Sequence, residues 1–348
     1  MSSASVSGTK GNQRIEGEGA RPFGDARGSA PARGVRGRAR RAVAGTAVAV
    51  MALGGIAATP QIGVAAERAP QGPPKVIVGG SPTTTSENPW VVALSSRQTF
   101  GSERSGQFCG GALIAPTRVL TAAHCVLEDD GTTADRPDLT VIQGRTDLRG
   151  TQGREVEVAA VHPNPSFDTT SVEGDWAVLD LAAALPGPVL PMVEQGENVY
   201  APDTPATVLG WGDTSGYGDY SPVLRKVTVP VTSDATCRSA YPGGVLGTYD
   251  AASMVCAGLP QGGKDACSAD SGGPMLIGGR LAGVVSWGHG CALPRKPGVY
   301  TRVSAFASDI RAAAGMSEPA GAEDAASAPA PTGSGATAGV GTSAPGSE

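Results

Sequence analysis

The sequence predicts an all-β protein made of antiparallel strands. Three observations support this fold class: apolar and β-branched residues occur in short runs, turn-forming Gly, Pro, Asn and Asp separate these runs, and only two segments have a helical pattern. Strands that follow one another in this way are typical of an antiparallel sandwich or barrel. An alternating α/β fold would need a helix between successive strands and is not expected.

Nine segments share the strand pattern. In chain order they are "WVVAL" (90–94), "RVLTA" (118–122), "LTVIQG" (139–144), "REVEVAAV" (154–161), "WAVLDL" (176–181), "ATVLGW" (206–211), "LRKVTVPV" (224–231), "LAGVVSW" (281–287) and "GVYTRV" (298–303). Two helices are expected: a short one over 233–241, entered through a Ser/Asp cap, and a final one that begins at Ser304 and ends at Gly315.

The ends of the chain differ from its middle in charge and composition. Residues 1–76 hold 11 Lys/Arg and 4 Asp/Glu, residues 77–314 hold 16 and 24, and residues 315–348 hold none and 4. The first 34 residues and the acidic, Pro/Ala/Gly/Ser-rich tail lack hydrophobic periodicity, which predicts disorder. We expect one domain, over 77–314, that is long enough to bury a core. Its mild acidity gives no reason to expect nucleic acid or an anionic membrane as a partner.

The segment before this domain has the pattern of an export signal. A basic cluster precedes about 17 mostly small apolar residues, and a small-residue cleavage site follows near Ala66. We therefore expect a signal peptide over 35–66, a short propeptide over 67–76 and a secreted, extracellular protein. A membrane anchor is the alternative, less favoured because the run is Ala/Gly-rich and short for a bilayer. An export signal rarely begins so far inside a chain, so residues 1–34 are either a disordered extension or, if translation starts near Val35, not translated.

Cysteine is confined to the middle segment. The six cysteines are Cys109, Cys125, Cys237, Cys256, Cys267 and Cys291. An even number in an exported chain favours disulfides. A zinc site is the alternative, but the chain has only three histidines and the cysteine spacing fits no finger or ribbon pattern. We expect no metal site and no cofactor.

Three residues could together carry out nucleophilic catalysis. His124 lies in "LTAAHC", Asp175 begins "DWAVLDL" and Ser271 lies in "DSGGP". Such catalysis needs a hydroxyl, a neutral imidazole that accepts its proton, and a buried carboxylate that orients the imidazole and stabilises its charged form. Each residue also has a structural interpretation: a serine before Gly-Gly is usually a turn residue, a lone histidine a core residue and a strand-end aspartate a cap. The combination of all three favours the catalytic interpretation.

The order of these three residues and their flanking motifs resembles the chymotrypsin/trypsin family of serine proteases, over Ile77 to about Arg311. The resemblance implies two six-stranded antiparallel β-barrels packed face to face, with the site in the crevice between them, a short intermediate helix and a C-terminal helix. Three disulfides are fewer than most animal members have and are similar to secreted bacterial relatives. The implied pairs are Cys109 with Cys125, Cys237 with Cys256, and Cys267 with Cys291.

In this family the residue six before the nucleophile lies at the base of the primary specificity pocket, and here it is Asp265. A buried carboxylate there implies protein or peptide substrates with Arg or Lys before the cleaved bond. Gly288 and Gly298 match the pocket-wall glycines, and Ala266 replaces a serine common in trypsins, so we expect a preference for Arg. The run "SWG" from Ser286 should bind an extended substrate as an added strand. The implied substrate-binding residues are Asp265, Ala266, Ser286, Trp287, Gly288 and Gly298.

The resemblance also implies synthesis as a zymogen. In the family a new N-terminal amine, usually on "IVGG", turns inward and pairs with the aspartate before the nucleophile; here these residues are Ile77 and Asp270. Without the amine, burying this unpaired carboxylate would destabilise the folded state by roughly 3 to 5 kcal/mol. Cleavage after Lys75 would leave Val76 as the N-terminus, one residue too long. We therefore expect activation after Val76, by a protease that accepts apolar residues.

One residue departs from the family pattern. The oxyanion hole is formed by the backbone N–H groups of the nucleophile, Ser271, and of the residue two before it, ordinarily glycine but here Ala269. If this position needs a positive φ, alanine costs about 1 to 2 kcal/mol that glycine avoids. Losing the donor would cost roughly 3 to 4 kcal/mol, so we expect a slower but working enzyme. The alternative is a catalytically weak homologue that binds proteins through the same cleft.

Two further expectations concern ions and partners. Arg145 stands where a carboxylate of the family's calcium loop is expected, so no essential ion is predicted. Monomer is the family's usual state, and protein protease inhibitors are candidate partners.

Overall fold

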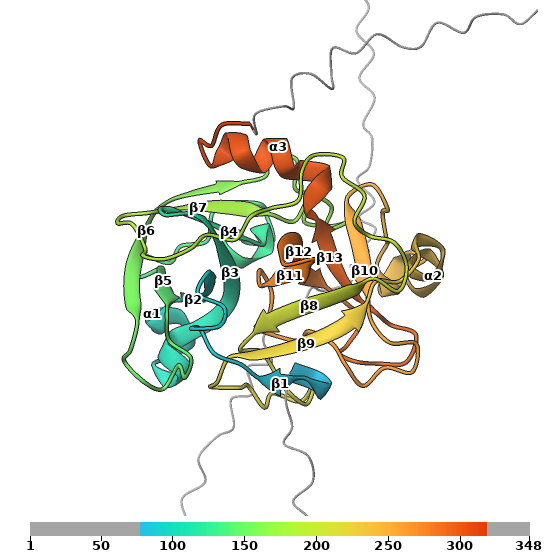
Figure 1. Ribbon diagram of the computed structural model, residues 1–348, viewed down its shortest axis with the longest axis horizontal. Coiled ribbons are helices and arrows are strands. Elements are labelled where there is room, and N and C mark those ends of the chain that lie inside the picture. Colours follow the sequence, from blue (N-terminus) through green and yellow to red (C-terminus); the bar gives the residue numbers. More distant parts are fainter. Residues whose placement is uncertain (1–76, 319–348) are drawn as a thin grey trace, which may run out of the picture.

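Two antiparallel sheets hold most of the regular structure (Figure 1). The computed structural model describes residues 77–318. The expected signal peptide, the propeptide, residues 1–34 and most of the tail lie outside the described residues. The first sheet is a closed six-stranded barrel in the order β2-β3-β4-β7-β6-β5. The second has seven strands in the order β1-β9-β8-β11-β12-β13-β10.

The elements between residues 77 and 318 are mostly short strands. The strands are β1 (Ser81–Pro82), β2 (Val91–Ser95), β3 (Gln107–Ala115), β4 (Arg118–Thr121), β5 (Thr140–Gln143), β6 (Arg154–Pro163), β7 (Ala177–Leu181), β8 (Pro205–Gly210), β9 (Arg225–Pro230), β10 (Met254–Ala257), β11 (Pro274–Ile277), β12 (Arg280–Trp287) and β13 (Gly298–Arg302). The helices are α1 (Arg97–Phe100), α2 (Asp234–Ala240) and α3 (Val303–Ala313). Single 3-10 turns occupy Ile77–Gly79, Glu103–Gly106, Ala123–Cys125 and Gly244–Leu246.

The predicted all-β, two-barrel architecture is confirmed. Each of the nine predicted strands and both predicted helices is present, with ends within two residues of those expected. The second sheet has seven strands instead of six because the two-residue β1 pairs with β9 at its edge, where Ser81 faces Lys226. One core cluster contains residues of both sheets, including Leu94 and Leu113 of the first and Val208 and Tyr300 of the second. The two sheets therefore pack against each other.

Strand β3 was not predicted, because two consecutive glycines interrupt its apolar run. Glycine is poor in strand propensity, yet the packing leaves no room for a side chain here. A Cβ on Gly111 would lie 2.7 Å from Cγ1 of Val119, and one on Gly110 would lie 3.1 Å from the Cα of Gly273. The two glycines therefore weaken the sequence signal, while Gly111 leaves room for β4 within the barrel and Gly110 allows β3 to approach the second sheet.

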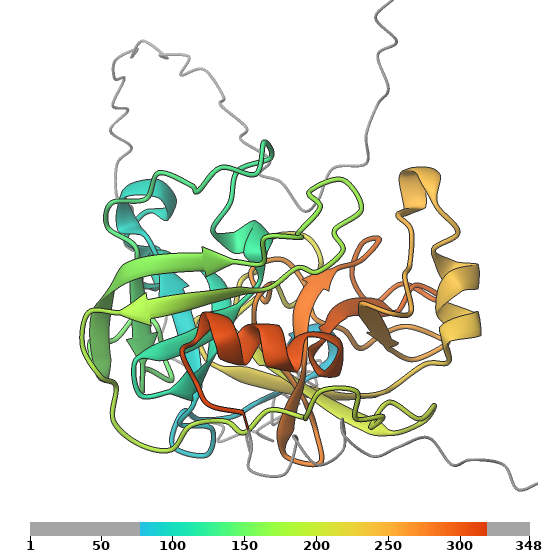
Figure 2. The ribbon, with the colours of Figure 1, turned by 90° about the horizontal axis from the view of Figure 1, so that it is seen from above.

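The C-terminal helix α3 bridges the two sheets (Figures 1 and 2). Its apolar face buries Val303, Ala307 and Ile310, and it contacts β7 of the first sheet and β12 of the second. At the opposite side of the second sheet, α2 starts at the expected cap, where the Ser233 hydroxyl accepts the N–H of Thr236. Within residues 77–318, no helix has the length and apolar character needed to cross a bilayer.

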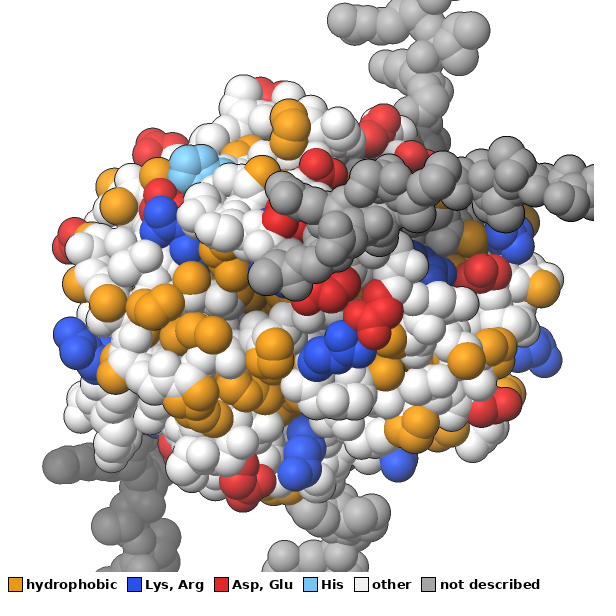
Figure 3. All heavy atoms as spheres, turned by 45° about the horizontal axis from the view of Figure 1, so that its top comes forward, with side chains coloured by type: hydrophobic (Ala, Val, Ile, Leu, Met, Phe, Trp, Pro, Cys, Tyr) orange, Lys and Arg blue, Asp and Glu red, His pale blue; other side chains and the backbone are white. Residues whose placement is uncertain are grey.

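Charged side chains of both signs are interspersed on the surface. Figure 3 shows acidic and basic side chains scattered over one face without a large field of a single sign, and hydrophobic side chains gathered mainly in the left half of the view. His162 lies in β6, and its Nε2 is 3.2 Å from Oδ2 of Asp180. This pair is a surface contact of the first barrel.

Candidate active site

Three separate elements supply the residues predicted to carry the chemistry. His124 lies in the 3-10 turn that follows β4, and Asp175 directly precedes β7. Because β4 and β7 are adjacent antiparallel strands, the end of one lies beside the start of the other. Ser271 comes from the turn before β11 in the second sheet, and its carbonyl accepts the N–H of Gly110 on β3 at 2.7 Å. The serine turn is thereby attached to the first barrel.

His124 and Asp175 form a tightly held pair. Nδ1 of His124 is 2.7 Å from Oδ2 of Asp175, and the backbone N–H of His124 donates to Oδ1 at 3.0 Å. The Ser286 hydroxyl donates to Oδ2 at 2.5 Å, and the Thr301 hydroxyl donates to the carbonyl of Asp175 at 2.6 Å. Asp175 is fully buried, while the imidazole remains one quarter exposed. The carboxylate therefore fixes the ring and leaves Nε2 as the reactive nitrogen.

The pair shifts the pKa of both members. Burial disfavours the charged imidazole, but the charge and hydrogen bond of Asp175 outweigh it and raise the pKa of His124 above 6.5. Burial likewise disfavours the charged carboxylate, but His124 and the donated hydrogen bonds lower the pKa of Asp175 below 3.8. Near neutral pH the carboxylate is thus ionised, ready to stabilise an imidazolium that forms during a reaction.

The turn that holds Ser271 requires glycine at the next position, Gly272. Gly272 has a φ of +77°, and a Cβ there would lie 2.2 Å from Oγ1 of Thr121, three residues before His124. Ser271 is half-buried and lines the adjacent pocket. Among the residues that the structure describes, its hydroxyl has no hydrogen-bond partner. Catalytic hydrogen bonds are often long without substrate and shorten in the reacting complex.

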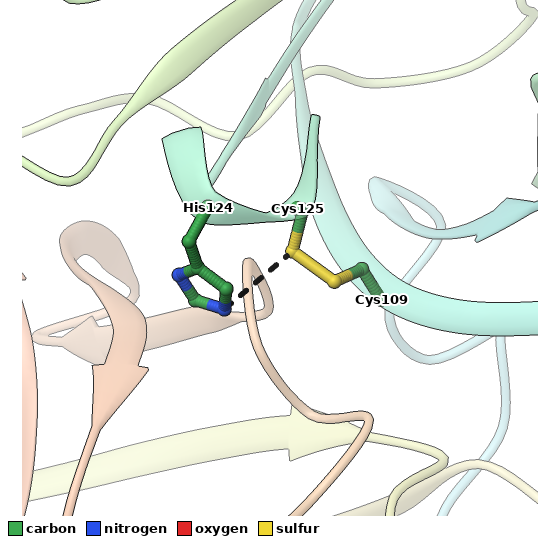
Figure 4. Close-up of side chains that lie close together, drawn as sticks. All are labelled: Cys109, His124 and Cys125. Atoms are coloured by element: carbon green, nitrogen blue, oxygen red, sulfur yellow. Dashed lines mark hydrogen bonds between the residues drawn. A yellow bond between two sulfur atoms is a disulfide. The ribbon is translucent and has the colours of Figure 1, made fainter. Parts of the chain in front are cut away.

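The sulfur atoms beside His124 do not form a metal site. Figure 4 shows the Cys109–Cys125 disulfide next to the imidazole, with Sγ of Cys125 at 4.0 Å from Nε2. These three residues are close enough together to suggest metal ligands. However, both sulfur atoms are consumed in the disulfide and Nδ1 is held by Asp175, whereas a metal would need thiolates.

The disulfides of the structure are the pairs that the resemblance implied. They are Cys109–Cys125, Cys237–Cys256 and Cys267–Cys291. The first joins β3 to the turn of His124, and the second joins α2 to β10. The third joins the chain just before Ser271 to the loop beyond Trp287 on the rim of the pocket. Two of the three therefore anchor segments next to the His124–Ser271 region.

Ala269 has the conformation that glycine would favour. Its φ is +69°, in the left-handed region, which costs alanine about 1 to 2 kcal/mol. Within the described chain, the backbone N–H groups of Ala269 and Ser271 donate to no acceptor, whereas those of Asp270 and Gly272 are paired. Two neighbouring unpaired donors can stabilise an oxyanion that develops beside them.

A pocket next to Ser271 ends in a buried carboxylate. Asp265 is 3% exposed; its Oδ2 accepts the N–H of Ala292 at 2.9 Å, whereas its Oδ1 is buried and has no hydrogen-bond partner among residues 77–318. Burial raises the pKa of Asp265 to about 7, although backbone hydrogen bonds oppose the shift. A Cβ on Gly298 would lie 2.7 Å from this free oxygen, so a side chain there would cover it. The pocket is lined by Asp265, Ala266, Cys267, Ser271, Val285, Ser286, Trp287, Gly288, Gly290, Gly298, Val299 and Tyr300.

A second buried carboxylate lies behind the serine turn. Asp270 is fully buried and accepts the N–H groups of Gly212 at 2.7 Å and Cys267 at 3.0 Å. Burial raises the pKa of Asp270 to about 7, although these two backbone hydrogen bonds and the charge of Arg104 oppose the shift. Ile77 is also fully buried, and the carbonyl of the next residue, Val78, accepts the N–H of Asp265 at 3.1 Å. The start of the described chain is thus joined to the pocket.

Sequence reasoning missed three residues that support the site. They are Thr301 on β13, Ala292 in the pocket loop and Gln107 at the start of β3. Each acts through a hydrogen bond to a residue far along the chain. Neither periodicity nor a local motif reports such a bond, so only a resemblance at these positions could have indicated them.

The two packed sheets bring the His–Asp pair of the first and the half-buried serine of the second into neighbouring segments, since Ser271 is bonded to β3 and Ser286, which lines the pocket of the serine, is bonded to Asp175. With the two N–H donors that are unpaired among the described residues, this is the arrangement expected of a serine endopeptidase. The family model described as Trypsin matches residues 77–310. Trypsin from Saccharopolyspora erythraea is 43% identical over 231 residues, which cover 66% of this chain and 94% of that protein. Trypsin-1 from Astacus astacus is 39% identical over 245 residues, which cover 68% of this chain and 99% of that protein. Trypsin from Sus scrofa is 33% identical over 237 residues, which cover 68% of this chain and 94% of that protein.

The chain belongs to the trypsin family of serine proteases. It is a hydrolase that acts on peptide bonds of protein or peptide substrates.

Proposed function

We propose that this protein cleaves peptide bonds after Arg and Lys through an acyl-enzyme formed on Ser271. The Ser271 hydroxyl attacks the substrate carbonyl carbon while Nε2 of His124 takes its proton, and Asp175 stabilises the resulting imidazolium. The N–H groups of Ala269 and Ser271 bind the oxyanion. The C–N bond then breaks, and the leaving amine takes the proton from His124. Water next attacks the acyl ester while His124 takes its proton. The bond to Ser271 then breaks, and Ser271 regains a proton from His124.

The unpaired Oδ1 of Asp265 is the observation that carries the proposed specificity. A buried acceptor without a donor is unfavourable, and a substrate guanidinium or ammonium supplies both the missing donor and the missing charge. An apolar side chain would leave this carboxylate uncompensated. Ala266 offers no hydroxyl to a lysine ammonium, whereas arginine can bind the carboxylate with two parallel hydrogen bonds, so Arg is preferred. Ser286, Trp287 and Gly288 bind the substrate backbone as an added strand.

The protein is made as a zymogen and activated by cleavage between Val76 and Ile77. The new amine of Ile77 pairs with Asp270 and supplies the cation that this buried carboxylate lacks. Burial of Ile77 and the hydrogen bond from Asp265 to Val78 support this position for the mature N-terminus. Residues 35–66 direct export before this cleavage, and the mature enzyme is an extracellular monomer open to protein protease inhibitors.

The proposal is tested with protein processed to begin at Ile77. A fluorophosphonate should label the wild type at Ser271 and should not label Ser271→Ala. Peptides that differ only in the residue before the bond should be cleaved in the order Arg, Lys and then, far more slowly, Ala or Phe. Asp265→Ser should lose the Arg and Lys preference and keep the labelling. An active form whose N-terminal sequence reads "VIVGG", or equal turnover of Arg and Lys peptides, would contradict the corresponding part of the proposal.

The alternative function is protein binding by a catalytically weak homologue. The strained φ of Ala269 is the observation that favours it. Wild-type protein that begins at Ile77, is folded and fails to react with the fluorophosphonate would support this alternative over the enzyme.

A further inference from the structure

The side-chain amide of Gln107 contacts the residue at the centre of the oxyanion hole. Gln107 is the first residue of β3 and is buried. Its Nε2 donates to the carbonyl of Ala269 at 2.8 Å and to the carbonyl of Cys109 at 3.2 Å. Its Oε1 accepts a hydrogen bond from the guanidinium of Arg104. The reversed amide would place its oxygen against two carbonyls and its NH₂ against a cation, so the orientation of this amide is determined by its partners.

Arg104 is held by contacts of its own. Its Nη2 also donates to the carbonyl of Trp211 at 3.0 Å, and its guanidinium carbon lies 4.8 Å from the ring centre of Tyr220. A hydrogen bond from a charged donor is stronger than one between neutral groups. The guanidinium therefore anchors the oxygen end of the Gln107 amide and directs its nitrogen toward Ala269.

The backbone on both sides of Ala269 is fixed by three hydrogen bonds. The carbonyl of Ser268 accepts the N–H of Asp213 at 2.8 Å, and the N–H of Asp270 donates to Cys267 at 2.9 Å. The third is the bond from Gln107 to the carbonyl of Ala269. In a trans peptide the N–H points opposite to the C=O, so the N–H of Ala269 points away from Asp213. This is the orientation in which the N–H remains unpaired and available.

Alanine makes this support necessary. The left-handed conformation that Ala269 adopts, at a φ of +69°, is open to glycine but disfavoured for a residue with a Cβ. The bond from Gln107 exists only while the carbonyl of Ala269 keeps its present direction. This carbonyl belongs to the Ala269–Asp270 peptide, whereas the N–H of Ala269 belongs to the preceding peptide, whose carbonyl is held by Asp213. The bond from Gln107 therefore fixes the C-terminal side of Ala269 and stabilises its left-handed conformation relative to any in which the Ala269–Asp270 peptide rotates.

We propose that Gln107, oriented by Arg104, is a positioning residue: it fixes the Ala269–Asp270 peptide and thereby holds Ala269 in the left-handed conformation in which its N–H, in the preceding peptide, is available to the oxyanion. This inference rests on the proposed function, because it assigns the Ala269 N–H to transition-state stabilisation. Gln107 itself touches no reacting atom. The Gln107 and Arg104 pair compensates for the alanine that this chain has in place of glycine.

The test is a double-mutant cycle between Gln107→Met and Ala269→Gly, made in the full chain and processed to begin at Ile77. Methionine has nearly the volume of glutamine and cannot donate. Gln107→Met should lower kcat on an Arg peptide about 10- to 100-fold, a partial loss of the effect of one oxyanion donor, with KM changed less than about twofold. In the Ala269→Gly background the same change should lower kcat less than about threefold, because glycine needs no support.

Two controls separate positioning from folding. Affinity for benzamidine, which occupies only the Asp265 pocket, should be unchanged in Gln107→Met, while affinity for a peptide boronate that forms a tetrahedral adduct should fall in parallel with kcat. Arg104→Met, which keeps Gln107 but removes its anchor, should give a smaller effect in the same direction and serves if Gln107→Met does not fold.

The outcomes distinguish this inference from the proposed function. Equal effects of Gln107→Met with Ala269 and with glycine at that position, or an unchanged kcat, would overturn the positioning role. Wild-type enzyme that fails to react with a fluorophosphonate would instead overturn the proposed function.

Discussion

The hydroxyl of Ser286, on β12 of the second sheet, donates a 2.5 Å hydrogen bond to the carboxylate of Asp175, which precedes β7 of the first. The acceptor, Oδ2, is also the oxygen that lies 2.7 Å from Nδ1 of His124. The carboxylate that orients the imidazole is therefore also hydrogen-bonded to the opposite sheet. Correct packing of the two sheets and correct electrostatics of His124 depend on the same contact.

Ser286→Ala should change both stability and pH dependence. Loss of a hydrogen bond to a buried charge should lower the free energy of unfolding by about 1.5 to 3 kcal/mol, measured by denaturant titration. Because Asp175 then shares less of its charge with a donor, the pKa of His124 should rise further, and the acidic limb of the kcat/KM profile should move to higher pH. Thr301→Val is the matched control, since it removes a bond to the backbone carbonyl of Asp175. It should cost stability without moving the limb; equal shifts in both variants would contradict the argument.

Activity should depend on a neutral His124. Asp175 raises the pKa of the imidazole above 6.5, so the base is protonated and inactive below that pKa, and kcat/KM should rise as pH increases through a value above 6.5. Asp175→Asn removes the charge that opposes burial, so the pKa of His124 should fall below its ordinary value, and kcat should fall about 10⁴-fold. The pKa can be read from the pH–rate profile and from imidazole NMR signals. If the acidic limb of the pH–rate profile keeps its position in Asp175→Asn, a group other than His124 causes it.

Sequence patterns predicted the strands and helices whose residues suit the local structure that they form. Alternating apolar runs placed nine strands, and the Ser/Asp cap placed the start of α2. Strand β3 was missed because close packing requires its two glycines against their local propensity: Gly110 faces Gly273 of the second half of the chain, and Gly111 faces Val119 within the barrel. The bonds from Gln107 to Ala269 and from Asp265 to Val78 join residues far apart in the chain, and no local pattern reports them. Contacts of this kind follow from the packing of the two sheets.

Binding of a cation in the pocket that ends in Asp265 should be coupled to the loss of a proton. Burial raises the pKa of Asp265 to about 7, so in the empty pocket this carboxyl is neutral at pH 5.5 and ionised at pH 8.5. A raised carboxyl pKa favours the folded state at low pH, and this contribution is lost as pH rises through about 7. An amidinium ligand binds the ionised form, so benzamidine affinity should increase as pH rises through about 7, with proton release near neutrality. Calorimetry in His124→Ala removes the titration of the imidazole, and protein processed to begin at Ile77 is used so that Asp270, whose pKa is also raised to about 7, has the Ile77 amine as its expected partner. Affinity that is independent of pH in this protein would contradict the assignment.

Arg145 should contribute strongly to stability because its guanidinium is enclosed by its partners. It is 4% exposed and donates to Glu155 at 2.6 Å, to the carbonyl of Gln152 at 2.7 Å and to the Ser105 hydroxyl at 3.0 Å. Removing one member of such a buried set leaves the others uncompensated, so Arg145→Ala should lower the free energy of unfolding by about 3 to 5 kcal/mol. Arg149 is a matched control, since its side chain is 66% exposed in an ion pair with Asp147.

Arg149→Ala should cost less than about 1 kcal/mol, because water screens an exposed pair. Both variants can be compared by denaturant titration at pH 7 and at high salt, where only the small contribution of Arg149 should decrease further. Similar losses in the two variants would mean that the Arg145 guanidinium is solvated in solution and is not enclosed by Glu155, Gln152 and Ser105.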